Sequence, residues 1–248
     1  MRINSFLKTL MLVLILSLFV GCSSDDEDSN PTGPENGGDN PPTINVKTIT
    51  VPQAMQNAAN NGDPGAATAM TYINLANSLP AYATLFNPPE GAAKLSSTSA
   101  VAGEWTWTQD GATFTLTSTE TTDSYFLTLT VDGTFNGNTY SGQKLMESTV
   151  SKDGNTGELF FYDPDTGVPA ITFNWQTESD GTYHLEMVAG ADYGGATVNM
   201  TINPDNSGTL NIDTADGGSW EIQWASDGSG SWTQYDAGGN PIDSGSWS

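Results

Sequence analysis

Apolar side chains recur at every second position through most of residues 103–248. Phe114 and Leu116 alternate with threonines, and Phe173 and Trp175 repeat the pattern further along the chain. Successive side chains of a β-strand point to opposite faces of the sheet, so this pattern predicts strands with one buried face and one solvated face. Threonine at the alternate positions fits the solvated face. We therefore expect residues 103–248 to form one β-domain.

Asp-Gly pairs interrupt the alternating stretches. Such pairs fit tight hairpin turns, because glycine adopts positive φ without steric cost. They occur at residues 110–111, 132–133, 153–154, 180–181, 216–217 and 227–228. No segment long enough for a crossover helix separates the strands, which excludes parallel pairing. The prediction is a mainly β fold: an antiparallel up-and-down meander of about ten strands that forms a barrel or half-barrel, or is covered by the preceding helical segment.

Residues 44–102 precede this domain and have a different composition. Residues 44–51 alternate apolar and polar side chains and are predicted to form one short strand. A helical segment follows, and residues 92–102 are expected to be a linker.

Helical punctuation marks residues 52–86, which are rich in Ala, Asn and Met. Pro52 suits a first helical position, and Asn61-Gly62 predicts a helix end. Asp63-Pro64 predicts a new N-cap followed by proline in the first turn. The residues after it follow helical spacing on one mostly small and apolar face: Ala66, Ala69, Met70, Ile73, Ala76 and Asn77.

The first 22 residues have the layout of an export signal. Arg2 and Lys8 form a short basic region, and residues 10–20 are an apolar run, too short for a bilayer span of about 20 residues. Gly21-Cys22 follows directly, and the whole segment resembles a bacterial lipoprotein signal. The resemblance implies that residues 1–21 are cleaved and that Cys22, the only cysteine, is acylated. The alternatives are an uncleaved anchor or a plain signal peptide.

An acidic run follows the cysteine at Ser24, Asp25, Asp26, Glu27 and Asp28. It resembles the surface-export signal of Bacteroidota-type lipoproteins, which implies an outer membrane lipoprotein exposed at the cell surface. The alternative is a solvated acidic tether on a periplasm-facing anchor. Residues 22–43 contain almost nothing apolar and cannot bury enough surface to become ordered, so they are expected to be a disordered tether.

The net charge excludes two classes of partner. The chain has six Lys and Arg against 29 Asp and Glu, and cleavage after residue 21 leaves four lysines, no arginine and a formal charge of −25. Binding to nucleic acid and polybasic attachment to anionic lipid both need clustered cations. We expect neither, and the oligomeric state stays open.

Gly103-Glu104-Trp105 opens the β-domain. This tripeptide resembles the Gly-x-Trp start of lipocalins, which are barrels that hold small apolar ligands. The resemblance implies a barrel architecture. It implies no particular ligand, because lipocalins also pack an arginine over that tryptophan and the chain that remains after cleavage has no arginine.

The chain has seven tryptophans, and five of them are the main candidates for ligand binding. They either pack in the core, line a cavity or form a sugar-stacking platform. The ligand-binding candidates are Trp105, Trp107, Trp175, Trp220 and Trp224. A cavity requires that four of them, Trp105, Trp175, Trp220 and Trp224, converge inside. A platform requires that some of the seven lie exposed in a row, with Trp232 and Trp247 near the C-terminus as the first candidates.

Residues for catalysis and metal binding are scarce. His184 is the only histidine, and it faces solvent if Tyr183 and Leu185 face inward. Residues 203–208 resemble the start of an EF-hand calcium loop, but Thr214 stands where that loop needs a glutamate. We therefore expect no enzyme, no metal and no cofactor.

The prediction for function is a non-catalytic binding module, with an apolar or amphiphilic small ligand first and a glycan second. The alternative is a structural or adhesive surface module without a small ligand. An open apolar cavity would favour a carrier, and a filled interior the structural alternative.

Overall fold

The computed structural model describes residues 47–95, 101–135 and 137–248. The predicted signal peptide, Cys22, the acidic run and the tether lie outside these residues. No described helix is both long and apolar enough to cross a membrane.

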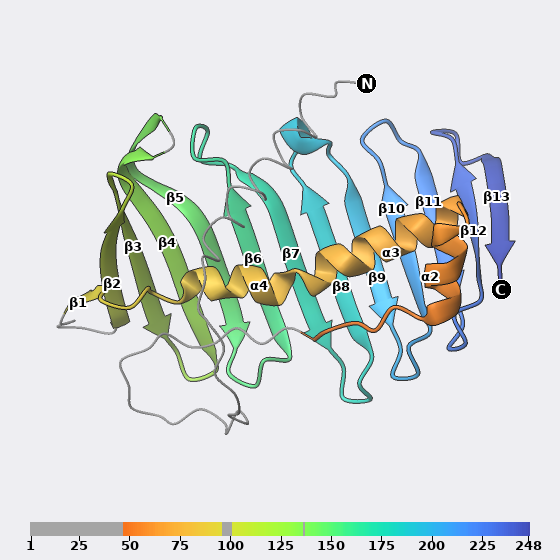
Figure 1. Ribbon diagram of the computed structural model, residues 1–248, viewed down its shortest axis with the longest axis horizontal. Coiled ribbons are helices and arrows are strands. Elements are labelled where there is room, and N and C mark those ends of the chain that lie inside the picture. The colour runs from red at the N-terminus through yellow and green to blue at the C-terminus, as the bar shows by residue number, and fades with distance from the viewer. Residues whose placement is uncertain (1–46, 96–100, 136) are drawn as a thin grey trace.

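Within these residues, thirteen antiparallel strands form one sheet in which spatial order follows sequence order (Figure 1). The meander is confirmed, but the count of about ten is wrong. The first and last strands do not pair with each other, so the sheet is open and the closed-barrel alternative is also wrong. The strands are β1 (Ala93–Leu95), β2 (Val101–Gln109), β3 (Ala112–Glu120), β4 (Ser124–Phe135), β5 (Asn138–Ser151), β6 (Thr156–Tyr162), β7 (Pro169–Thr177), β8 (Tyr183–Ala189), β9 (Thr197–Ile202), β10 (Gly208–Asp213), β11 (Ser219–Trp224), β12 (Gly230–Tyr235) and β13 (Pro241–Trp247).

The miscount has a physical cause at the two ends of the sheet. Strand β1 falls in the predicted linker, is three residues long and has only exposed side chains, so it carries no alternation. Strands β12 and β13 are rich in Gly and Ser, which weakens their apolar pattern. Backbone pairing with a neighbour defines these three strands, and β12 and β13 each bury a single residue, Trp232 and Trp247.

Five of the six Asp-Gly pairs lie in hairpin turns, as predicted. The exception is Asp132-Gly133, which lies within β4 where its pairing with β5 shifts register. Gly133 has a φ of 102°, and a Cβ there would come within 2.8 Å of the carbonyl oxygen of Gly111. Glycine therefore serves a bulge at this position, not a turn.

The predicted helices are confirmed. They are α2 (Gln53–Asn60), α3 (Pro64–Asn77) and α4 (Leu79–Ala83), followed by the 3-10 turn η1 (Thr84–Phe86). Asp63 caps α3, because its Oδ1 accepts the backbone N–H of Ala66 at 2.8 Å. Pro52 precedes α2 as its N-cap, one position before the predicted place.

The strand predicted at residues 44–51 is wrong for the part that the structure describes, since residues 47–51 have no regular structure. Ile49 is nevertheless buried. The side chain of Asn77 accepts the Ile49 N–H at 2.7 Å and donates to its carbonyl at 2.8 Å. One amide side chain thus supplies the two hydrogen bonds that a neighbouring strand would have made.

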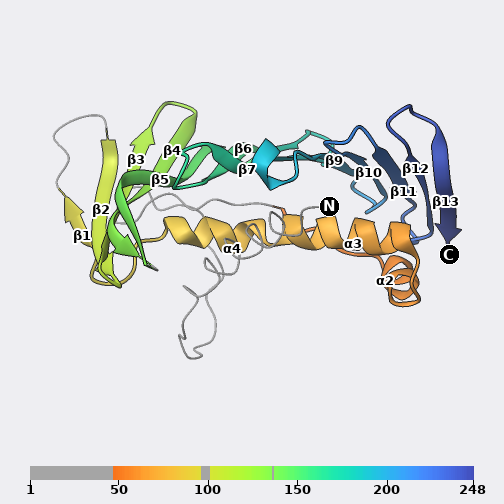
Figure 2. The ribbon, with the colours of Figure 1, turned by 90° about the horizontal axis from the view of Figure 1, so that it is seen from above.

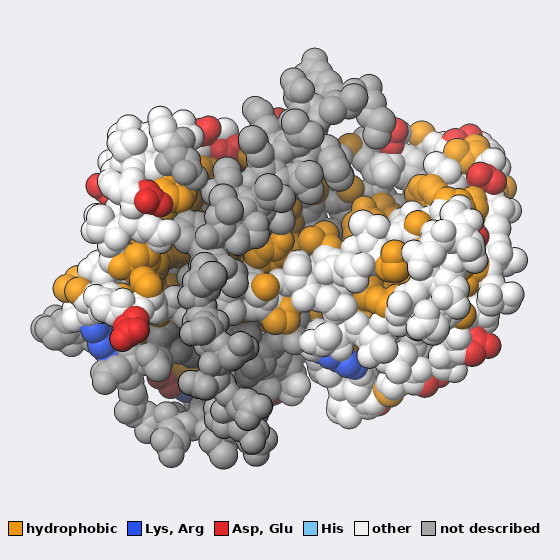
Figure 3. Space-filling view, viewed as in Figure 1, with side chains coloured by type: hydrophobic (Ala, Val, Ile, Leu, Met, Phe, Trp, Pro, Cys, Tyr) orange, Lys and Arg blue, Asp and Glu red, His pale blue; other side chains and the backbone are white. Residues whose placement is uncertain are grey.

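Seen from above, the sheet arches over α3 and α4, which run across the strands (Figure 2). The inner face of the sheet and these helices share one apolar core. Viewed from the helical side, apolar side chains lie alongside the helices while Asp and Glu lie towards the rim (Figure 3).

Tryptophans of the inner face lie over glycines of the neighbouring strands. Trp175 pairs with Gly157, Trp224 with Gly208 and Trp247 with Gly230. A Cβ added to any of these glycines would come within 2.1 to 2.5 Å of the paired indole. Glycine in these strands therefore marks a close approach that a larger residue would block.

Candidate functional site

The predicted tryptophan cavity is not assembled. All five candidates lie on the inner face, where Trp105, Trp175 and Trp224 are buried and Trp107 and Trp220 are half-buried against the core. Trp105 on β2 and Trp175 on β7 are five strand spacings apart, about 24 Å along the sheet. The aromatic rings that stack on Trp107 and Trp220 do not belong to other candidates. Trp107 stacks on Phe114, and Trp220 stacks on Trp232 with ring centroids 5.2 Å apart.

The predicted platform is also wrong, because Trp232 and Trp247 are only 6% and 8% exposed. The indole N–H of Trp247 donates to the Gly228 carbonyl at 2.6 Å, which fixes the ring against the sheet. Trp232 packs on Gly65 at the start of α3, where a Cβ would come within 2.0 Å of the ring. Trp232 thereby joins the end of the sheet to α3.

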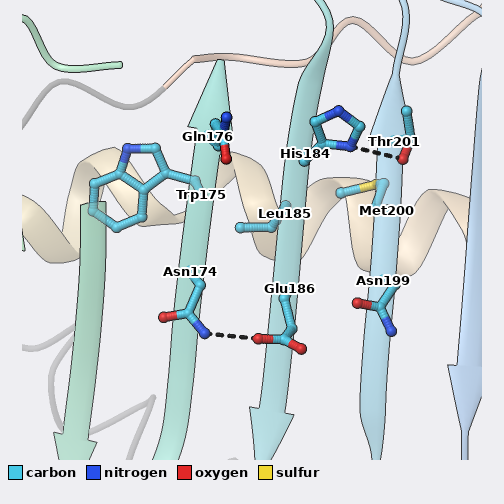
Figure 4. A pocket seen from close by; sticks show the side chains of 9 residues that line it. All are labelled: Asn174, Trp175, Gln176, His184, Leu185, Glu186, Asn199, Met200 and Thr201. Carbon is cyan, nitrogen blue, oxygen red and sulfur yellow. Dashed lines mark hydrogen bonds between the residues drawn. The ribbon is translucent and has the colours of Figure 1, made fainter. Parts of the chain in front are cut away.

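A groove of about 340 Å³ lies on the opposite, outer face of the sheet (Figure 4). It crosses β7, β8 and β9, and polar side chains two residues apart on each strand form its two walls. One wall is Asn174, Glu186 and Asn199, and the other is Gln176, His184 and Thr201. Two residues of a strand span about 7 Å, which sets the distance between the walls.

Buried neighbours hold these walls in place. Between the walls lie Trp175, Leu185 and Met200, whose side chains are buried on the inner face. Because side chains alternate along a strand, anchoring these three residues inward fixes their polar neighbours outward. The sequence correctly predicts His184 on the solvated face, where it is exposed. Its place in a groove was not predicted.

Two hydrogen bonds organise the groove. Asn174 Nδ2 donates to Glu186 Oε2 at 2.8 Å along one wall. His184 Nδ1 and Thr201 Oγ1 lie 3.1 Å apart along the other. The lining therefore offers amides, a hydroxyl, an imidazole and one carboxylate, all of which can bond to hydroxyl groups.

A half-buried aromatic pair lies beside the groove on the same outer face. Phe160 and Tyr162 of β6 have ring centroids 6.3 Å apart. Phe160 pairs with Thr172, two residues from Asn174, so it is a diagonal neighbour of the groove wall. Aromatic faces beside polar groups combine an apolar contact with directional hydrogen bonds.

Lys144 and Glu147 of β5 hold Tyr162, one member of the aromatic pair. The Lys144 ammonium lies 4.9 Å from the Tyr162 ring centroid and forms an ion pair with Glu147. The Tyr162 hydroxyl donates to Glu147 Oε2 at 2.9 Å. Partial burial raises the pKa of Glu147, but hydrogen bonds from Lys144 and Tyr162 outweigh it and hold that pKa below its ordinary value. Burial and the bond to Glu147 raise the pKa of Tyr162.

A local feature of the sequence indicates this aromatic pair, but the prediction of ligand-binding residues considered only the tryptophans. Phe160, Phe161 and Tyr162 are three consecutive aromatics in a strand. Alternation places the middle one inward, where Phe161 is buried, and therefore places the other two outward.

The groove and its surroundings show no metal centre. Among the residues that the structure describes, no three His, Cys, Asp or Glu side chains come together to hold an ion. Residues 203–207 instead make the turn between β9 and β10, in which the Asp205 carboxylate accepts both the N–H and the hydroxyl of Ser207, and Gly208 begins β10.

Comparison of the chain with protein-family models and with curated proteins finds no match in either set.

Proposed function

We propose that the protein is a lipid-anchored surface module that binds glycans on the outer face of β6 to β9 without changing them chemically. Glycans present many hydroxyl groups together with apolar ring faces. The groove supplies hydrogen-bond donors and acceptors, and Phe160 and Tyr162 supply an adjoining apolar surface. The proposal depends chiefly on this juxtaposition of a solvent-facing polar groove with outward aromatics.

The observed packing gives less support to a carrier of apolar ligands. A carrier needs apolar side chains around an open cavity. The tryptophans that would have lined one instead cover glycines, stack on one another and pack against the core. The groove, in contrast, is of a size that ligand sites commonly have.

The proposed location comes from the sequence alone. Acylation of Cys22 would attach the protein to a membrane, and the acidic run Ser24 to Asp28 would direct it to the cell surface. A tether of about 20 residues spans roughly 25 Å, which would hold the sheet clear of the bilayer. A domain in this position meets extracellular polysaccharide directly.

Affinity gel electrophoresis tests the proposal with the soluble domain. Gels that contain neutral polysaccharides such as glucan, mannan or xylan should retard the protein. A double variant, His184→Ala with Asn199→Ala, removes one exposed side chain from each wall. Its affinity should fall about tenfold, since a hydrogen bond contributes about 0.5–1.5 kcal/mol.

Thr113→Ala with Thr117→Ala is the matched control. Both threonines lie on the outer face of β3, away from the groove. This variant should migrate like the wild type. Equal retardation of both variants and wild type would contradict binding in the groove, and absence of retardation in every gel would contradict glycan binding.

A further inference from the structure

The groove is one section of two longer polar rows on the outer face. Strand pairing continues the first wall in both directions along the sheet, so that each strand from β6 to β11 contributes one side chain. This row is Glu158, Asn174, Glu186, Asn199, Asn211 and Glu221. The second row runs from β7 to β11 through Gln176, His184, Thr201, Thr209 and Gln223.

We propose that the site takes a linear, non-acidic polysaccharide whose chain lies across the strands, along these two rows. This inference rests on the proposed glycan binding and adds the shape and charge of the ligand. Adjacent strands lie about 4.8 Å apart, so the five steps from β6 to β11 span about 24 Å. A single sugar would contact only part of this length. A polymer would meet an amide, hydroxyl or carboxylate at each step.

The exposure of the rows supports an extended ligand. Asn211, Thr209, Glu221 and Gln223 are all exposed, which leaves the β10 and β11 part of the rows open to solvent. Their inward neighbours Leu210 and Ile222 are buried, and these fix the two strands in the same way as in the groove. The far end of the rows therefore presents its side chains to solvent from strands that are anchored by buried neighbours.

The charges of the rows select against acidic polymers. Each of Glu158, Glu186 and Glu221 belongs to the first row, and no described lysine lies on either row. Lys144 and Lys152 form ion pairs with Glu147 and Glu120, and Lys47 donates to the Gly181 carbonyl. A chain of uronic acids would therefore meet carboxylates without compensating cations.

Calorimetric titration with an oligosaccharide series tests this inference. The probes are neutral β-1,4-linked gluco-, manno- and xylo-oligosaccharides from disaccharide to octasaccharide, with polygalacturonate fragments as the acidic series. For the neutral family that binds, affinity should rise with length and level off once the rows are covered. Acidic fragments should bind more weakly than neutral ones of equal length.

A double variant at the far end, Asn211→Ala with Gln223→Ala, tests whether long ligands reach the β10 and β11 part of the rows. It should bind the shortest oligosaccharides like the wild type and lose about tenfold in affinity for the longest, equivalent to one or two hydrogen bonds. Equal affinity for short and long oligosaccharides would overturn the extended ligand while leaving glycan binding intact. Acidic fragments that bind as tightly as neutral ones would overturn the charge selection, and no binding at any length would overturn the proposed function itself.

Discussion

The indole of Trp175 on β7 occupies the space directly above Gly157 on β6. The two residues are cross-strand partners, and a Cβ at Gly157 would lie 2.1 Å from the ring. The tryptophan thereby covers a backbone that glycine leaves bare, and its burial helps to fix the strand that carries Asn174 and Gln176. Strand β7 therefore contributes Trp175 to the core on one face of the sheet and Asn174 and Gln176 to the groove on the other.

The first prediction concerns this contact. Gly157→Ala should destabilise the domain by about 1–3 kcal/mol, because an added carbon forces the indole or the backbone to move. Thr156→Ala, at the exposed neighbouring residue, should change stability by less than about 0.5 kcal/mol. Urea unfolding followed by tryptophan fluorescence measures both, and equal midpoints for the two variants would contradict the packing described.

The second prediction tests the register of β7. Phe173 is 1% exposed on the inner face, so Phe173→Ala should cost about 3–5 kcal/mol. Thr172→Ala, on the outer face, should cost less than about 1 kcal/mol. Chemical denaturation gives both values. Because a one-residue slip exchanges the two faces, a reversed order of the two costs would show a different register.

The third prediction concerns acid stability. Hydrogen bonds from adjoining residues hold the pKa values of six turn aspartates below the ordinary value: Asp153, Asp180, Asp205, Asp216, Asp227 and Asp236. A folded pKa below the unfolded one adds stability that is complete above the unfolded pKa and lost as the pH falls through the folded pKa. The urea midpoint should therefore hold between pH 7 and about pH 5 and fall below about pH 4.

A paired variant isolates this effect. Asp205→Asn with Asp227→Asn keeps side-chain oxygens that can accept from Ser207 and Ser229 but removes two titrating groups. Its midpoint should fall less steeply with acid than that of the wild type. A midpoint that rises below pH 4 would instead show that relief of repulsion among the carboxylates dominates.

The fourth prediction concerns the anchor. Cys22→Ala should abolish acylation and release the protein from the membrane fraction, because no other cysteine can carry the lipid. Fractionation with mass measurement checks this, and unchanged mass and membrane association would refute the anchor.

Replacing Asp25 to Asp28 by serine should leave the protein anchored but protect it from protease added to intact cells. Equal digestion of this variant and the wild type would show that the acidic run acts only as a tether and not as an export signal.

The sequence was informative wherever local chemistry decides structure. Asp63 and Pro64 start α3 as predicted, and period-two alternation places Phe173 inward and His184 outward. It failed at β1, whose side chains are all exposed, and at Asp132-Gly133, where the same dipeptide serves a bulge. Neither feature differs locally from a linker or a turn.

The groove was beyond prediction for a different reason. Asn174, Glu186 and Asn199 are far apart in the sequence and meet only through the pairing register of β7, β8 and β9. The tryptophans misled because large aromatics suit a core as well as a ligand site. Their glycine partners, such as Gly157 and Gly230, were the sign that they belong to the core.

The central claim, that ligand binds on the outer face, is tested most directly by NMR of the one histidine. His184 is the only imidazole in the chain and lies in the groove, so its ring signals report on this site alone. Adding a neutral polysaccharide that retards the protein in gels should shift the His184 signals, while the indole N–H signal of Trp247, which is buried on the inner face, stays unchanged. A shift of the Trp247 signal with no change at His184 would place the ligand between sheet and helices and contradict the account.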